Sequence, residues 1–347
     1  MVKKYFVSGF MAEDIKGISS ILDENCFSAN TWLPWVNGTV NLNRLLETES
    51  NLYIRSERFL TENEKCYGVT IKGFSAVQHK LLPIHKIDHT FCENFLFESS
   101  YDDIILISSD ISHETGCSRE SSVFIYKVSE NYSLTKSFVV PELVKQISVG
   151  HAHAIALADN GKSLFTWGCN TRGELGTSSN KVNSEKFELV EQLNGMNWAM
   201  VAAGGWHSAC LSPTGDVYLW GWNADGQIGA DPMTEGSVIS SPRLLDISMR
   251  PAEVKSENFV DFQKVALGSR HSVLLDVDGN VWTFGWNAYG QCQPGPPNDE
   301  NNMRNYYEES SANWQPKIMD FGTSTPVVVV SIAAAPWTTI SAYYSDK

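Results

Sequence analysis

Short stretches of alternating apolar and polar residues, separated by glycine or by Asp/Asn-Gly turns, run along most of this chain. A period of two with frequent turn residues predicts β-strands joined by tight hairpins, with little helix. In the first half of the chain, such strands are expected at residues 65–71, 103–107 and 123–128, with a loop at 111–121. The pattern therefore predicts an all-β protein.

One unit of this pattern occurs in three full copies, and half of a fourth copy follows them. Each unit has a short apolar strand, a turn, a strand that begins at histidine, a hairpin, and an aromatic-Gly-x-Asn-x-x-Gly ending. The histidines of the three full copies, His153, His207 and His271, lie 54 and 64 residues apart. Four short strands at this spacing are typical of a propeller blade, and the chain has room for about six or seven blades.

Residues near the two ends of the sequence resemble the two halves of one repeat unit. The half copy at 332–340 lacks the aromatic-Gly half of the unit, and residues 5–10 resemble that missing half at 282–286. We therefore predict a seven-bladed β-propeller spanning 1–347, whose last blade is closed by strands from both termini, the amino-terminal ones within 1–20.

The segment from 20 to 148 matches the unit poorly, whereas 149–344 carries it clearly. Degenerate blades are the simplest interpretation of 20–148, because the predicted terminal closure places both ends in one domain. A separate amino-terminal domain is the alternative.

Composition and charge narrow the class of protein. The chain has 347 residues, 42% of them hydrophobic and 19% charged, with a net charge of -14. It contains no apolar run near the roughly 20 residues of a membrane span and no credible secretory signal. Its seven cysteines form no Cys-x-x-Cys pair, which favours free thiols in the nucleus or cytosol. The acidity disfavours direct nucleic-acid binding and favours basic protein partners.

Common motifs of catalysis and cofactor binding are missing from the sequence, so we expect neither an enzyme nor a bound cofactor. The sequence has no phosphate-binding Gly-x-x-x-x-Gly-Lys-Ser/Thr, no Gly-x-Ser-x-Gly and no His-Glu-x-x-His. His79, His85, His89 and Cys92 are metal-ligating residue types, but their spacing fits no compact zinc pattern, so no metal site is predicted. The repeat histidines are interpreted as hydrogen-bonded structural residues.

The units resemble the regulator-of-chromosome-condensation repeat family, whose pattern joins Ala-Gly-x-x-His-Thr/Ser to Tyr-x-Trp-Gly-x-Asn-x-x-Gly-Gln-Leu-Gly. The stretches that carry the resemblance are 203–208, 220–223 and 268–271. The resemblance implies a non-catalytic, chromatin-associated nuclear scaffold that acts as adaptor for a Jumonji-type oxygenase in histone methylation control and chromosome segregation. Guanine nucleotide exchange on a small nuclear GTPase is the alternative.

The position before each repeat histidine is the candidate binding site. It holds Ala152, Trp206 and Arg270, with Trp337 aligned in the last copy, and the repeat places these turns on one face near the axis. The family's exchange factor has acidic and polar residues at such turns, and this chain has none, which argues against exchange. Aromatic and arginine side chains are common interface anchors. We therefore predict that Trp206, Arg270 and Trp337 form a partner-binding surface on a monomer.

Overall fold

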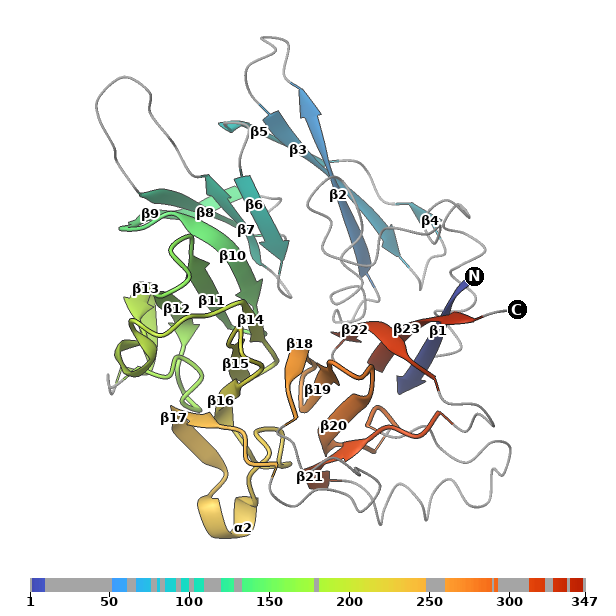
Figure 1. Ribbon diagram of the computed structural model, residues 1–347. Helices are drawn as coiled ribbons and strands as arrows, with labels where there is room; N and C mark the ends of the chain where they lie inside the picture. Colours follow the sequence, from blue (N-terminus) through green and yellow to red (C-terminus); the bar gives the residue numbers. More distant parts are fainter. Residues whose placement is uncertain are drawn as a thin grey trace.

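Antiparallel sheets make up most of the described residues of the computed structural model, in agreement with the all-β prediction (Figure 1). The structure describes residues 2–9, 52–60, 67–75, 80–81, 85–91, 95–99, 103–108, 120–127, 133–177, 181–247, 260–288, 290–292, 312–321, 327–335 and 338–345. Within these residues the strands form six sheets, and the helices are two short turns, η3 (Glu191–Leu193) and α2 (Pro232–Glu235).

Each sheet is a run of strands that are close in sequence, except the sheet that contains both termini. The first two sheets are β2 (Leu52–Leu60), β3 (Tyr67–Ser75), β4 (Lys80–Leu81), β5 (His85–Phe91), and β6 (Phe95–Ser99), β7 (Asp103–Ser108), β8 (Ser121–Lys127), β9 (Ser133–Val140). The next two are β10 (Val144–Val149), β11 (His153–Ala158), β12 (Leu164–Cys169), β13 (Asn183–Leu189), and β14 (Met200–Ala203), β15 (His207–Leu211), β16 (Val217–Trp222), β17 (Val238–Leu244). The last two are β18 (Phe262–Leu267), β19 (His271–Asp276), β20 (Val281–Trp286), β21 (Ala312–Ile318), and β22 (Val329–Ala335), β23 (Thr338–Ser345), β1 (Val2–Gly9).

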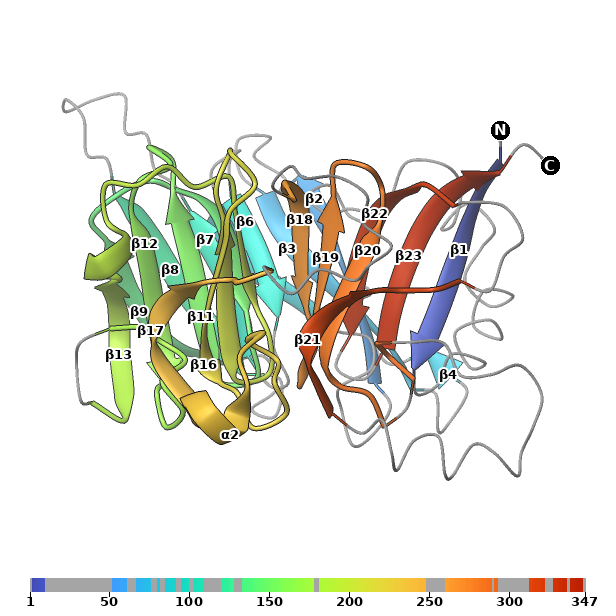
Figure 2. The ribbon, with the colours of Figure 1, turned by 60° about the horizontal axis from the view of Figure 1, so that its bottom comes forward.

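The sheets stand side by side around a common axis, as in a propeller (Figures 1 and 2). Neighbouring sheets contact one another through their first strands, β6 with β10, β10 with β14, β14 with β18, and β18 with β22. These are the inner strands, and β13, β17 and β21 lie at the outside. Small residues suit the crowded inner position, as in β14, where Val201, Ala202 and Ala203 are buried.

The three clear repeat units fold into three sheets with the same register. The repeat histidine that opens the second strand pairs with a glycine of the third strand, as His207 does with Gly221. At that glycine the pairing with the outer strand shifts, which is a β-bulge. Gly221 has φ 108, and a Cβ there would lie 2.6 Å from the carbonyl oxygen of Trp206, so only glycine fits.

The apolar core lies between adjacent sheets. One cluster joins Ile155, Leu157 and Leu164 of one sheet to Cys210 and Trp220 of the next. The following interface has the same arrangement, with Phe284 fully buried among residues from two sheets. Trp220 and Phe284 thus fill the space between adjacent sheets, and each sheet depends on its neighbour for burial.

The repeat histidines also link neighbouring sheets. Nε2 of His207 lies 3.1 Å from Oγ of Ser272 in the next sheet, and that hydroxyl donates to the carbonyl oxygen of Gln227 at 2.6 Å. His153 and Ser208 make the same link one sheet earlier. Because the serine hydrogen is already donated to a carbonyl, the histidine must donate through Nε2–H. The structural interpretation of these histidines is confirmed.

Burial keeps these histidines neutral. His207 and His271 are fully buried, and loss of hydration lowers the pKa of each to about 3. For His207 the neighbouring histidines lower the pKa further. These inter-sheet hydrogen bonds are therefore made by uncharged imidazole throughout the neutral pH range.

The two termini share one sheet. Strand β1 pairs antiparallel with β23 along its whole length, from Val2 opposite Ser345 to Gly9 opposite Thr338, and β23 pairs in turn with β22 (Figure 2). The described residues thus include a terminal sheet of three strands. A total of seven blades and closure of the ring stay predictions.

The amino-terminal half contains the three predicted strands, with shifted ends. They correspond to β3, β7 and β8, and each belongs to a four-stranded antiparallel sheet. Ser121, which was assigned to the loop, opens β8, and most of the predicted loop lies outside the described residues. The division of the chain into degenerate and clear blades stays a prediction.

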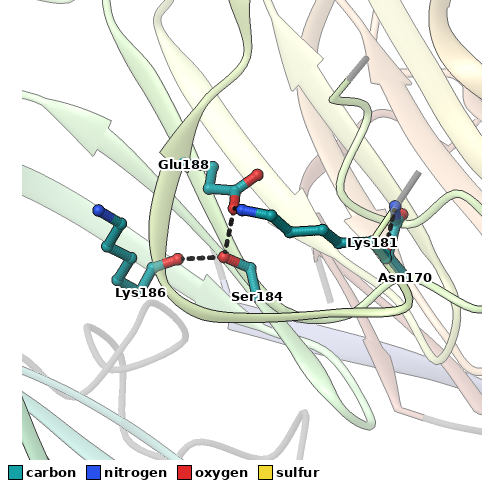
Figure 3. Close-up of polar contacts among 5 residues, drawn as sticks. All are labelled: Asn170, Lys181, Ser184, Lys186 and Glu188. Carbon is teal, nitrogen blue, oxygen red and sulfur yellow. Dashed lines mark hydrogen bonds and ion pairs between the residues drawn. The ribbon is translucent and has the colours of Figure 1, made fainter. Parts of the chain in front are cut away.

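A bulged outer strand carries a polar cluster (Figure 3). Glu188 of β13 forms an ion pair with Lys181 at 3.0 Å and accepts a hydrogen bond from Ser184 at 2.9 Å. Burial alone would raise the pKa of Glu188, but these hydrogen bonds and the charges of Lys181 and Lys186 outweigh it and lower the pKa. Asn170 donates to the carbonyl oxygen of Lys181, which ties the start of the outer strand to the loop after β12.

The cysteines among the described residues are free thiols, as predicted. They are Cys169, Cys210 and Cys292, and burial raises the pKa of Cys210 and Cys292.

Neither of the described helices is long and apolar enough to cross a membrane.

Candidate partner-binding face

The turns that precede the repeat histidines lie next to the ends of the third strands. The backbone N–H of Trp222, the last residue of β16, donates to the carbonyl oxygen of Trp206 at 2.8 Å, and Trp286 of β20 donates to Arg270 at 2.8 Å. The bulge at the preceding glycine sets the direction of the residue that follows it, because a bulge re-aims the side chains beside it. Four large side chains from two sheets are therefore brought to one end of the strands.

The loop after each third strand completes this face. It opens with an asparagine whose Oδ1 accepts the amide five residues later, as Asn170 does from Leu175 at 3.1 Å and Asn223 from Ile228 at 3.2 Å. This bond fixes the loop, and its third residue is Arg172 in one sheet and Asp225 in the next. Both side chains are partly exposed.

Indole and guanidinium groups alternate across the face. Cζ of Arg172 lies 4.5 Å from the ring centroid of Trp206 and 4.1 Å from that of Trp222, two rings that meet edge to face at 85°. Cζ of Arg270 lies 4.7 Å from the centroid of Trp222 and 5.3 Å from that of Trp286. Cation–π contacts at these distances are worth about 0.5–2 kcal/mol each.

At its other end the series continues with His151, whose ring stacks on Trp206 with centroids 5.0 Å apart and planes 23° apart. We call this group the aromatic–arginine ladder, and it consists of His151, Arg172, Trp206, Trp222, Arg270 and Trp286. All six side chains are half-buried. The ladder crosses from the sheet of β10–β13 through that of β14–β17 to that of β18–β21.

The two arginines differ in their electrostatic environment. Nε of Arg270 donates to Oδ2 of Asp225 at 2.7 Å, so its charge is paired. Burial raises the pKa of Asp225, and the charge and hydrogen bond of Arg270 oppose that rise. Arg172 has no such pair among its described contacts, and its Nη1 is buried without a hydrogen-bond partner.

A buried carboxyl group lies beneath Arg172. Glu174 has no exposed surface, and its Oε2 accepts the backbone N–H of Arg172 at 2.7 Å. In the next sheet the side-chain amide oxygen of Gln227 accepts the backbone N–H of Asp225 in the same way. Glu174 therefore occupies the position at which that repeat unit has glutamine. Burial raises the pKa of Glu174, although backbone hydrogen bonds and the charge of Arg172 partly offset the rise.

The structure places two of the three predicted partner-binding residues on the ladder. Trp206 and Arg270 both contact Trp222, and neither is free of packing, since one stacks on a histidine and the other is ion-paired. Ala152, which follows the ladder residue His151 in sequence, is exposed. Trp337 lies outside the described residues.

Arg172, Trp222 and Trp286 were not predicted as site residues. A signal for the tryptophans was present, because both follow the aromatic-Gly pair at the same position of the unit. Arg172 had no comparable signal, since the other units have Asp225 and Tyr289 at its position.

The described residues of this face form no metal site. The described ranges contain no group of three or more His, Cys, Asp or Glu side chains placed to hold a metal ion. The side chains of His79, His85, His89 and Cys92 lie outside the described residues. What the face offers chemically is flat apolar surface and guanidinium donors.

Comparison with known families and structures agrees with this fold. Models of the regulator of chromosome condensation (RCC1) repeat match residues 163–211 and 214–275, and a second model of the same repeat matches 144–174 and 262–291. These residues therefore carry RCC1-type repeats, and the chain is similar in fold to RCC1 β-propellers.

Among individual proteins, the chain is similar to RCC1 domain-containing protein 1 of Mus musculus, with 30% identity over 236 residues. That match covers 60% of this chain and 58% of the mouse protein, so the chain spans little more than half of that relative. In structure it is similar to yeast RCC1 (Prp20), solved bound to Kap60, with a TM-score of 0.59 and 17% identity over 85% of this chain and 65% of that one. A second structure of Prp20p, from Saccharomyces cerevisiae, gives a TM-score of 0.58 at 16% identity, covering 81% and 68%.

Proposed function

We propose that this protein is a non-catalytic protein-interaction scaffold, and that the aromatic–arginine ladder is its principal binding face. The observation that carries the proposal is the convergence of three indoles and two guanidinium groups, all half-buried, at one end of three adjacent sheets. Trp and Arg side chains that are already packed are the commonest energetic anchors of interfaces, because little conformational entropy is lost when they bind.

The finer proposal concerns the biological setting. The resemblance to RCC1 domain-containing protein 1 supports a nuclear, chromatin-associated adaptor for a Jumonji-type oxygenase, with a role in histone methylation control and chromosome segregation. Basic chromatin proteins are a second partner class. The net charge of -14 supports it, as does the similar Prp20p, whose structure was described together with its binding to Gsp1p and histones.

Nucleotide exchange on a small nuclear GTPase is the alternative, and the fold shared with yeast RCC1 favours it. The carboxylates of the ladder face argue against it. Asp225 is paired with Arg270, and Glu174 is buried beneath Arg172, so neither is available to displace a nucleotide or its metal ion.

Partner recovery from nuclear extract tests the scaffold proposal. The tagged protein is compared with a variant carrying Trp206→Ala, Arg270→Ala and Trp337→Ala, and with each single variant. The control is Leu244→Ala with Val277→Ala, which removes apolar side chains that are 48% and 60% exposed. Leu244 ends β17 and Val277 lies in the turn after β19, both at the opposite end of the strands from the ladder. Because Trp206 and Arg270 make internal contacts, thermal unfolding of every variant is measured first.

The expected result is that the triple variant stays folded and loses partners that the control variant retains, with a Jumonji-type oxygenase among them. Retention of every partner by a folded triple variant would show that this face is idle. A nucleotide-release assay on the purified GTPase decides the alternative, and acceleration by substoichiometric protein would establish exchange activity instead.

A further inference from the structure

The guanidinium group of Arg172 is held in place by aromatic rings alone. It packs against Trp206 and Trp222 at 4.5 and 4.1 Å, and no acceptor among the described residues bonds to it. Its hydrogen bond to Glu174 uses the backbone N–H and leaves the guanidinium donors free. A partly exposed cation is therefore fixed in orientation with its donors unused.

This arrangement is unlike that of the other arginine of the ladder. Arg270 faces Trp222 and Trp286 in the same manner, but its Nε already donates to Asp225 at 2.7 Å. The pair Arg270–Asp225 has no net charge, so the surplus positive charge of the face is centred on Arg172.

The carboxyl group nearest to Arg172 does not cancel that charge fully. Glu174 is buried, its Oε2 is occupied by a backbone amide, and its Oε1 has no hydrogen-bond partner. Glu174 accepts the backbone N–H of Arg172 and makes no hydrogen bond to its guanidinium group. Its carboxyl group lies buried beneath the face, whereas the guanidinium group of Arg172 is partly exposed on it. The ladder is thus a locally positive, aromatic surface on a chain of net charge -14.

We infer that the ladder receives an acidic segment of a partner protein, and that Arg172 pairs with an Asp or Glu carboxylate of that segment. The inference rests on the proposed function, since it names the chemistry of the partner at the same face. A planar guanidinium presents parallel N–H donors that match the two oxygens of a carboxylate, and the flanking indoles exclude water from the pair. Basic partners, such as histones, would then have to bind another part of the molecule.

The test uses a random dodecapeptide library displayed on phage, selected on the full-length protein and sequenced. Asp and Glu should be enriched in the selected peptides. Synthetic versions of the enriched peptides should bind the Arg172→Gln variant at least about tenfold more weakly, which is the loss of one charge-assisted pair. Arg172→Lys should recover only part of the affinity, because lysine lacks the planar fork.

Of two further variants, one is expected to bind the acidic peptides more tightly and the other is a control that should bind them as the wild type does. Asp225→Asn should tighten binding of the acidic peptides, because it frees the second guanidinium at Arg270. Arg243→Gln should leave binding unchanged, because it removes a cation that is paired with Glu235 on the outer strand β17. Thermal unfolding of each variant shows that the fold is retained.

The outcomes separate this inference from the proposed function. If the selected peptides are basic or uncharged and still depend on Trp206, the face binds partners but the inference is wrong. If a phosphoserine peptide binds far more tightly than its glutamate counterpart, the ligand is a phosphorylated segment and the inference is also wrong. If no selected peptide depends on Trp206 or Arg172, the proposed function itself fails.

Discussion

Replacement of Ser272 by alanine tests whether the inter-sheet histidine link stabilises the fold. Oγ of Ser272 lies 3.1 Å from Nε2 of His207 and donates to the carbonyl oxygen of Gln227 at 2.6 Å. All three residues are fully buried, so water cannot replace the lost hydroxyl. Ser272→Ala therefore leaves one buried donor and one buried acceptor without partners.

Each orphaned buried group costs about 1–3 kcal/mol, so the unfolding free energy should fall by about 2–6 kcal/mol. That is a large share of the roughly 5–15 kcal/mol by which proteins of this kind are stable. Equilibrium unfolding in urea, followed by tryptophan fluorescence and by circular dichroism, measures the loss. Coincidence of the two curves shows whether the array of sheets unfolds as one unit.

Two variants make this measurement interpretable. Ser272→Thr keeps the hydroxyl and should retain most of the stability, since Thr339 occupies the equivalent position and lies 3.1 Å from Nε2 of His271. Ser237→Ala makes the same chemical change at an exposed residue and should have little effect. If Ser272→Ala and Ser237→Ala unfold at the same urea concentration, the link contributes nothing and the reasoning is refuted.

Further predictions concern pH, a buried carboxyl, the termini and exchange activity. His207 and His271 have a pKa of about 3 in the fold, against 6.5 when unfolded, so their contribution is complete above pH 6.5 and is lost as pH falls toward 3. The loss should be about 1.4 kcal/mol per histidine per pH unit in denaturant unfolding, and a flat profile would contradict it. Glu174→Gln should raise the melting temperature at pH 7 and lose this advantage below about pH 4.5, because the raised pKa of Glu174 makes the wild type less stable as pH rises. Deletion of residues 1–10 removes the partner of β23 and should cause aggregation in size-exclusion chromatography, whereas a monomer with an unchanged melt would exclude a stabilising role for β1. Purified protein should not accelerate nucleotide release from the small nuclear GTPase in a fluorescence assay.

The fold of the repeat units could be predicted from sequence because its determinants are local. In each unit the histidine that opens the second strand pairs with a glycine of the third strand, as His207 of β15 pairs with Gly221. Alternation of apolar residues marks the strands themselves. The pairing of the termini was also visible, since the segment at 5–10 resembles the half that the last copy lacks. In the first half of the chain, strands were predictable but their ends and their pairing were not, because no repeat fixed the register.

The binding face was predictable only in part. Repetition placed Trp206 and Arg270 on one face, as the structure shows. The contacts that build the ladder join different sheets, so they depend on how far Arg172 reaches toward Trp222 of the next sheet. A single unit carries no information about that distance. The contacts between indole and guanidinium groups on this face therefore could not be predicted from the sequence of one repeat unit, because they depend on how neighbouring sheets pack.

The pairing of β1 with β23 has a consequence for biosynthesis. Val2 leaves the ribosome long before its partner Ser345, because 345 − 2 = 343 residues separate the two positions in the sequence. At about 5–20 residues per second, translation keeps the first strand waiting for roughly 20–70 s before its partner exists. During that interval an apolar strand with Tyr5, Phe6 and Val7 has unpaired backbone groups that could pair with other nascent chains. The terminal sheet can therefore form only after β23 has been synthesised, and until then β1 is a segment that a chaperone would have to protect.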